Sequence, residues 1–277
     1  MAIKSTKTPR KILFGLKMTV AVVLIGFAFI RLAQILYFTD TKILSDKILF
    51  YTALLIISYF WVQKIIEYRR VLEINKSLLK TQEQLRQAEF ATISSLVKTE
   101  EASDLYTRGH SQRVTDVAVA IAEELNLDEE EKKAIARAGI LHDIGKIGIS
   151  RDILHKKGEL TDEEWAPIKA HPLKAVEILE PLKFLDQEKK IILSHHERYD
   201  GKGYPQGLKG SEICFEASIL SVADSFDSMR SKRPYRQPLD KENIITELLK
   251  SSGTQHAPEV VEALLRLLTK RPHLWEK

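Results

Sequence analysis

The residues best suited to chemistry are histidines and aspartates spread between positions 110 and 224. The set comprises His110, His142, Asp143, His171, His195, His196 and Asp224. Imidazole and carboxylate groups together suit iron, manganese or zinc with coordination positions left open for water, whereas closed structural zinc sites are rich in thiolates. If the fold brings these residues together, they predict a site for two catalytic metal ions.

Two adjacent pairs within this set, His142–Asp143 and His195–His196, bear on the number of metals. Neighbouring residues on a helix point about 100° apart, so one pair can reach two metals on opposite sides of a cavity. Taken singly, each histidine is better explained as a surface or capping residue, and the prediction depends on the combination. The remaining histidines fit no such pattern and are predicted to lie on the surface: His155, His256 and His273.

The elements that must position these side chains are helices, and the fold class is predicted to be all-α. Apolar residues recur at helical spacing from about residue 99 onward, and no alternating stretch is long enough for a sheet. A capping box at Thr161–Glu164 and a first-turn proline at Pro172 mark two helix starts. The other predicted helices are 111–125, 128–141, 186–197, 216–229, 240–249 and 258–268.

Six segments occur in the order and spacing of a known family. They are DLYTRGHSQRV (104–114), HDIGKIGI (142–149), LTDEEW (160–165), HP (171–172), HHERYDGKGYP (195–205) and VADSFDSMRSKRPYR (222–236). Together they resemble the HD-GYP domain, a branch of the HD phosphohydrolases, over about residues 99–268. The resemblance implies a phosphodiesterase that opens the bacterial second messenger cyclic di-GMP, giving linear pGpG, GMP or both.

The resemblance also implies a metal centre of two divalent ions, iron or manganese, with zinc also compatible. A hydroxide bridging the two ions would be the nucleophile. His110, His142, Asp143 and Asp224 match the ligands of one metal. His171, His195 and His196 match those of the second, with Asp143 bridging. Family members with a third metal carry a glutamate where this chain has Tyr106, so two metals are expected.

The resemblance implies further roles around the substrate. Asp143 and Lys146 match the catalytic residues, Lys146 lying beside the scissile phosphate, where its charge offsets that of the phosphodiester. Tyr204, Arg233 and Arg236 match positions near the bound nucleotide. Purely structural alternatives remain open. Lys146 also suits a helix end, and the glycine-rich loop around Tyr204 also suits a structural turn. The chain departs from the family at His256-Ala257-Pro258, where a capping aspartate is usual.

The first third of the chain has a different composition. Residues 1–98 carry a net charge of +9 and the remainder −5, and the basic residues flank apolar stretches at 12–38 and 48–66. Each stretch is about as long as a bilayer core requires. Lysine and arginine flank both ends while the connecting loop is nearly neutral, which predicts a two-pass hairpin in the inner membrane with the catalytic part cytoplasmic. The partner of this charge is therefore lipid rather than DNA. A cleaved signal peptide or a buried hairpin is the alternative.

Residues 67–98 are predicted to form a helical connector. Apolar and small residues alternate at spacings of three and four: Val71, Ile74, Leu78, Thr81, Leu85 and Ala88. This seam predicts a short parallel coiled coil that makes a homodimer, although a helix packed on its own domain has the same pattern. The chain is thus divided into a transmembrane hairpin (1–66), a coiled-coil linker (67–98) and an HD-GYP domain (99–277).

Two other functions fit the same residues. One is an HD hydrolase acting on another cyclic dinucleotide or nucleotide. The other is a non-catalytic membrane receptor that binds a nucleotide. Cys214 is the single cysteine, so no disulfide forms within the chain.

Overall fold

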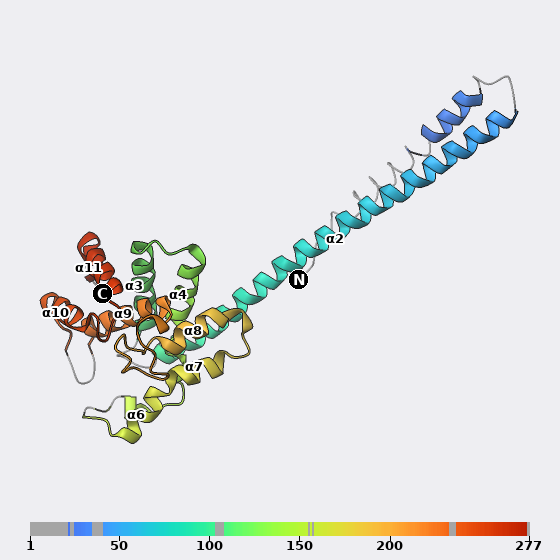
Figure 1. The fold of residues 1–277 in the computed structure, drawn as a ribbon. Coiled ribbons are helices and arrows are strands. Elements are labelled where there is room, and N and C mark those ends of the chain that lie inside the picture. The colour runs from blue at the N-terminus through green and yellow to red at the C-terminus, as the bar shows by residue number, and fades with distance from the viewer. Residues whose placement is uncertain are drawn as a thin grey trace. The chain divides into compact units, whose positions relative to one another are not determined.

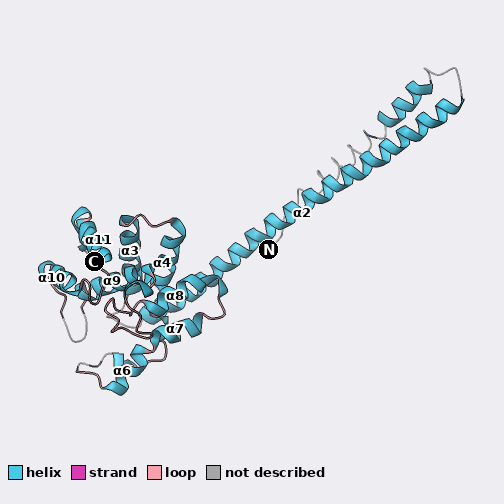
Figure 2. Cartoon of the chain, in the orientation of Figure 1, coloured by secondary structure: helices cyan, strands magenta, loops and turns pink. Residues whose placement is uncertain are grey.

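The computed structural model describes residues 22, 25–34, 41–102, 108–154, 156, 158–232 and 237–275. The chain separates into two compact units, Met1–Gln84 and Leu85–Lys277. Every regular element in the described ranges is a helix, and Figure 2 draws no strand there. The all-helical class predicted from the sequence is confirmed.

The first unit is built on the amino-terminal part of α2, a helix of 62 residues that runs from Thr41 to Ala102. The shorter apolar helix Ile25–Gln34 lies beside it (Figure 1). The rings of Phe29 and Tyr51 are 5.6 Å apart, and a Cβ on Gly26 would lie 2.8 Å from Leu55. Gly26 lies against Leu55 and Phe29 against Tyr51, so a later residue of the short helix contacts an earlier residue of α2, and the two segments run in opposite directions.

Among the described helices, α2 alone has a segment, Ser45–Thr99, that is long and apolar enough to cross a membrane on length and composition. Its large apolar side chains are exposed, including Leu49, Phe60 and Trp61. Within the predicted first span, 12–38, the structure describes only residue 22 and residues 25–34, so most of that span lies outside the described residues.

The second unit is a set of short helices, with a long loop between α8 and α9. Its α-helices are α3 (His110–Glu124), α4 (Glu129–Leu141), α5 (Arg151–Leu154), α6 (Asp162–Lys169), α7 (His171–Leu179), α8 (Asp186–Ser194), α9 (Phe215–Arg230), α10 (Lys241–Ser251) and α11 (Pro258–Lys270). Its 3₁₀ turns are η1 (Ile144–Lys146), η2 (Lys183–Leu185), η3 (Gly210–Glu212) and η4 (Pro272–Trp275). The predicted capping box at Thr161–Glu164 opens α6, and Asp128 and Glu131 form a second one that opens α4.

The core of this unit lies where α3 packs against α4 and α9, and where α8 packs against α4 and α7 (Figure 1). Fully buried side chains from these helices, such as Ile121, Ile135 and Phe226, fill it. Val97, near the end of α2, belongs to the same cluster of buried residues. Burial of this apolar surface is the main favourable term that holds the helices in place.

A glycine allows η1 to approach α7 closely. A Cβ on Gly145 would lie 2.0 Å from the carbonyl oxygen of His171 and 2.6 Å from the amide nitrogen of Ala175. No side chain fits at those distances, so glycine is required there. This contact brings the His142–Asp143 segment against the start of α7, where His171 lies.

Two expectations from the sequence are corrected. Helix α8 ends at Ser194 and not at Glu197, because the chain turns at His195 and His196 so that Glu197 can bond the loop that follows. His256, expected on the surface, is buried at 3% exposure. The reason is that its loop folds back, with the Gly253 amide donating to the His256 carbonyl (2.9 Å) and the Tyr199 amide to the Gln255 carbonyl (3.2 Å).

Candidate metal centre

The structure brings all seven predicted ligand residues into one cluster in the second unit. His110 is the first residue of α3, His142 and Asp143 follow α4, and His171 is the first residue of α7. His195 and His196 follow α8, and Asp224 lies within α9. Ligand-type atoms lie within 4.8 Å of one another in three groups: His171 with His195 and His196; His110 with His142 and Asp224; and His142 with Asp143 and His195.

The outer nitrogen of each central histidine is held by a backbone carbonyl. His142 Nδ1 is 2.8 Å from the Gly139 carbonyl oxygen, His171 Nδ1 is 2.6 Å from that of Ile168, and His195 Nδ1 is 2.6 Å from that of Ile192. A carbonyl only accepts, so Nδ1 must carry the proton and donate. The lone pair therefore lies on Nε2, the nitrogen that faces the cluster.

Those inward nitrogens fit a metal site. Within the described part of the chain, the buried Nε2 atoms of His142, His171 and His195 and the Oδ1 atom of Asp143 make no hydrogen bond. Burying a polar atom without a partner costs free energy, so such atoms are rare and need an explanation. Neutral imidazoles with their second nitrogen tied to a carbonyl are the usual form of metal-binding histidine. The donor set thus suits divalent transition metals.

Asp143 lies between His171 on one side and His110 and His142 on the other. Its Oδ1 is 3.5 Å from His171 Nε2, while its Oδ2 is 3.5 Å from His142 Nε2 and 4.0 Å from His110 Nε2. Each carboxylate oxygen therefore faces a different group of imidazoles. This is the geometry that a carboxylate needs in order to bridge two metal ions.

The electrostatics favour neutral imidazoles on one side and ionised carboxylates at the centre. Burial lowers the pKa of His171 to about 4 and that of His196 to about 3, and lowers the pKa of His195 well below its usual value. Burial opposes ionisation of Asp143, but the electrostatic attraction of the surrounding imidazoles, His142 first, and of the Lys146 ammonium outweighs it and keeps its pKa well below the usual range.

His110 has a different environment. Its Nε2 is 3.2 Å from Asp224 Oδ1 and its Nδ1 is 2.8 Å from Asp227 Oδ2. Burial alone would lower its pKa, but hydrogen bonds to these two carboxylates raise it to about 9. Metal binding at His110 therefore has to displace a proton at neutral pH.

Asp227 was missed in the sequence, where it was given no role. It is fully buried, and besides His110 it accepts hydrogen bonds from Arg113 Nε (2.9 Å) and Arg230 Nε (3.1 Å). The arginines offset the burial of its charge and hold the carboxylate in one place. It lies three residues after Asp224, one helical turn along the same face of α9, and this spacing was the signal available in the sequence.

Glu197 is the second residue that the sequence did not single out. Its buried carboxylate accepts hydrogen bonds from the amides of Gln206 (2.6 Å), Gly207 (3.1 Å) and Leu208 (3.0 Å). These bonds shape the loop that carries Tyr204. The Tyr204 ring stacks on His196, with centroids 4.9 Å apart and an interplanar angle of 28°.

The remaining predicted site residues divide into two groups. Lys146 Nζ is 2.6 Å from Asp143 Oδ2, and its side chain is more exposed than that of the aspartate, so it lies at the open side of the cluster. Arg233 and Arg236, together with Tyr106, lie outside the described residues.

Comparison with known proteins gives the family. Residues 73–260, more than half of the chain, match the family model of the HD domain. The chain belongs to the HD domain family. Its HD domain is homologous to cyclic di-GMP phosphodiesterases.

Three relatives show the range of this homology. The cyclic di-GMP phosphodiesterase response regulator RpfG of Xanthomonas campestris pv. campestris is 39% identical over 200 residues, 72% of this chain and 53% of that protein. A cyclic di-GMP phosphodiesterase of Thermotoga maritima is 44% identical over 182 residues, 64% of this chain and 49% of that protein. The 3'3'-cGAMP-specific phosphodiesterase 2 of Vibrio cholerae is 38% identical over 183 residues, 65% of this chain and 35% of that protein. The chain thus spans about half the length of the first two.

Proposed function

We propose that this HD domain hydrolyses the phosphodiester bonds of cyclic di-GMP, giving pGpG, GMP or both, at a centre of two divalent metal ions. The observation that carries the proposal is Asp143, whose two oxygens face different groups of imidazoles. The names of two relatives, both cyclic di-GMP phosphodiesterases, support the substrate.

In this proposal the seven residues divide into two ligand sets that share Asp143. His110, His142 and Asp224 hold one metal, and His171, His195 and His196 hold the other. When bound, two divalent ions, iron or manganese, lower the pKa of a shared water and neutralise charge on the phosphodiester. The carbonyl bonds to Nδ1 keep three of the imidazoles turned inward before any metal arrives.

Lys146 is assigned to the scissile phosphate. Its ammonium already contacts Asp143 and lies toward the open side, so a phosphate entering there meets a positive charge. Tyr204 orients His196 by stacking and presents its ring beside the site. Burial and the nearby carboxylates of Asp143 and Asp224 raise the pKa of Tyr204, so its phenol stays protonated and can donate to the nucleotide. Arg233 and Arg236 are assigned to the same nucleotide.

The remainder of the chain is proposed to anchor and pair this domain at the inner face of the cytoplasmic membrane. The antiparallel contact of Ile25–Gln34 with α2 and the exposed apolar side chains of α2 support a two-pass hairpin within residues 1–66. Residues 67–98 would form the coiled coil of a homodimer, since the apolar residues of its seam, among them Leu78 and Leu85, are exposed along one helix.

The direct test uses the full-length chain, purified in detergent without oxygen. Metal content is counted per chain, and cyclic di-GMP hydrolysis is followed with iron or manganese present. Two metals and product formation are expected. A chain that binds fewer than two metals, or that binds two and leaves cyclic di-GMP intact, contradicts the proposal.

Related substrates give the second arm of the same assay. Because one relative is specific for 3'3'-cGAMP, that dinucleotide is assayed beside cyclic di-GMP at equal concentration. Faster hydrolysis of 3'3'-cGAMP would identify that dinucleotide as the preferred substrate and leave the proposed metal chemistry unchanged. Nucleotide binding without turnover would instead indicate a receptor.

A further inference from the structure

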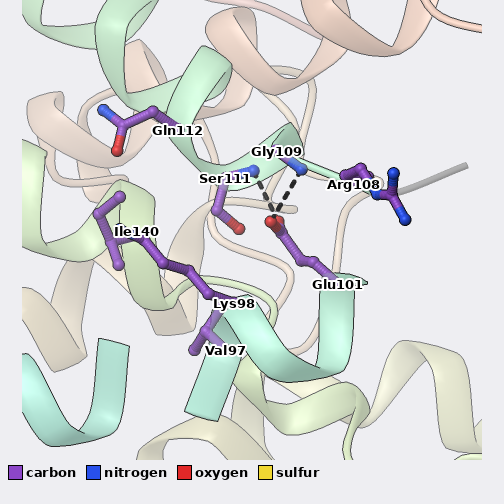
Figure 3. A pocket seen from close by; sticks show the side chains of 8 residues that line it. All are labelled: Val97, Lys98, Glu101, Arg108, Gly109, Ser111, Gln112 and Ile140. Atoms are coloured by element: carbon purple, nitrogen blue, oxygen red, sulfur yellow. Dashed lines mark hydrogen bonds between the residues drawn. The ribbon is translucent and has the colours of Figure 1, made fainter. Parts of the chain in front are cut away.

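A buried glutamate joins the end of α2 to the start of α3. Figure 3 shows Glu101 with its carboxylate directed at the backbone of the segment that begins α3. Its Oε2 accepts a hydrogen bond from the Gly109 amide (3.1 Å), and its Oε1 accepts one from the Ser111 amide (2.8 Å). The glutamate is 7% exposed although it carries a charge.

The contact supplies what α3 lacks locally. The N-cap residue of α3 is Gly109, which has no side chain to accept hydrogen bonds and adopts a left-handed conformation (φ 69°). The first amides of a helix need acceptors, and the positive end of the helix dipole favours a negative charge. Glu101 satisfies both needs from another helix, eight residues back along the chain, and the two hydrogen bonds account for the burial of its charge.

The two bonded amides flank His110. Glu101 therefore holds the backbone on both sides of this histidine, while Asp227 holds its ring through Nδ1. Rotation or withdrawal of the last turn of α2 would release the backbone bonds and leave the bond from Asp227. Because metal affinity depends on how well each ligand is oriented, the position of α2 would then change the affinity at His110.

The surroundings of Glu101 leave room for such a change. A cavity of about 260 Å³ lies beside it, lined by Val97 and Lys98 of α2, by Arg108 and Gln112, and by Ile140 of α4 (Figure 3). Ser111 Oγ, which also lines the cavity, is buried and makes no hydrogen bond within the described ranges. Packing on this side of α2 is therefore incomplete, so its last turn can shift without displacing the core.

We propose that Glu101 is a positioning residue that couples the end of α2 to the metal ligand His110. The inference rests on the proposed metal centre, since its consequence is the affinity of one of the two metals. In the simpler alternative, Glu101 is only a helix cap, and its loss lowers stability without changing the site.

The test compares Glu101→Ala and Glu101→Gln with a matched capping variant, Glu131→Ala. Glu131 caps α4 by accepting from the Asp128 amide, and it is half-buried. For the full-length chain in detergent, three quantities are measured: hydrogen exchange of the peptide covering residues 108–113, the dissociation constants of both metals, and hydrolysis at low and saturating metal.

For Glu101→Ala we expect about tenfold faster exchange in that peptide and about tenfold weaker binding of one metal, the lower end of the range seen when outer-shell partners are removed. Hydrolysis should fall at low metal and recover at saturating metal. Glu101→Gln should show the same changes to a smaller degree, because its amide oxygen still accepts one hydrogen bond. Glu131→Ala should leave metal binding unchanged.

The outcomes separate the inference from the proposed function. If the wild-type chain binds no metal, the proposed function fails and the coupling fails with it. If it binds two metals and both Glu101 variants bind them like the wild type, only the coupling is overturned. If Glu101→Ala does not fold, Glu101→Gln decides between the two results.

Discussion

Two regions of this chain place side chains in opposite unfavourable environments: polar atoms are buried in one and apolar side chains are exposed in the other. In the metal centre, buried imidazole nitrogens face one another without a hydrogen bond in the described residues. Along α2, large apolar side chains such as Phe60, Leu78 and Leu79 are more than 45% exposed. A buried polar atom calls for a polar partner and an exposed apolar face calls for an apolar one. Metal ions would satisfy the buried nitrogens, and lipid or another copy of the helix would cover the exposed apolar face.

The two regions differ in how firmly the structure holds these side chains. Each inward nitrogen of the central histidines is oriented by a second contact, since Nδ1 donates to a carbonyl one turn earlier. Within the described ranges, the large apolar side chains of the seam on α2, such as Leu78 and Leu85, are exposed, and their placement follows from the helix alone. The site is therefore preorganised for its ligand, whereas the α2 face is defined only by its sequence pattern.

The largest expected effect comes from removing the carboxylate of Asp143, which is proposed to bridge the two metals. Asp143→Ala should abolish binding of at least one metal and lower kcat at least about a hundredfold, because outer-shell partners alone are worth up to that much. Metal counting and the cyclic di-GMP assay measure both. Asp152→Ala, on the exposed side of α5, is the control and should match the wild type. Full metal content in Asp143→Ala would break the assignment of this residue as a bridge.

A smaller loss is expected from Asp227→Asn. The change keeps an acceptor for His110 but removes the charge that two arginines contact, so one metal should bind about 10- to 100-fold more weakly. Titration with the metal, followed by calorimetry, measures this. Asp116→Asn, at an exposed position on α3, is the control. Equal affinities in both variants would show that the ring of His110 needs no support.

Lowering the pH tests the role of the Asp227 charge with the same variant. Burial alone would raise the pKa of Asp227. Its hydrogen bonds to His110 and Arg113 outweigh burial and lower the pKa in the folded protein. Its ionised form therefore contributes stability above the unfolded pKa near 4, and the contribution is lost as pH falls below that value. The difference in unfolding free energy between the wild type and Asp227→Asn, about 1–3 kcal/mol at pH 7, should shrink below pH 4.

The next effect is a dependence on alkaline pH. The pKa of His110 is raised to about 9, so in the metal-free protein its protonated form contributes stability below about pH 6.5, and this is lost as pH rises through about 9. The contribution is on the order of 3 kcal/mol. Thermal unfolding with a chelator present should show it, and metal-loaded protein should lack it. A metal-free melting temperature that rises between pH 7 and 9 would contradict this role.

The smallest expected effect concerns α2. Leu78 and Leu79 are exposed to similar extents, 62% and 67%, but only Leu78 lies on the predicted seam. Leu78→Lys should weaken a homodimer about tenfold, and Leu79→Lys should not, since only seam positions pack between helices. Sedimentation in detergent measures the dissociation constant. Equal behaviour of the two variants would favour lipid or an unpaired helix over a coiled coil.

Much of the site was predictable because residue types and motif spacing can be read directly from the sequence. All seven candidate ligands were named from residue type and motif spacing, and the structure gathers them in one cluster. The helices around them followed from apolar periodicity and caps such as Thr161. What failed was the detail at helix ends: the end of α8 and the burial of His256 depend on loop contacts that periodicity does not contain.

The sequence by itself determined which residues carry the chemistry, that the fold is helical, and where apolar surface is left over, because these follow from residue type and spacing. The tertiary structure decided how the residues act together. Asp143 faces two groups of imidazoles, Asp227 and Glu101 hold His110 from two directions, and Glu197 shapes the loop of Tyr204. Each of these contacts joins residues whose approach depends on how the helices and loops pack, and packing is a property of the whole unit.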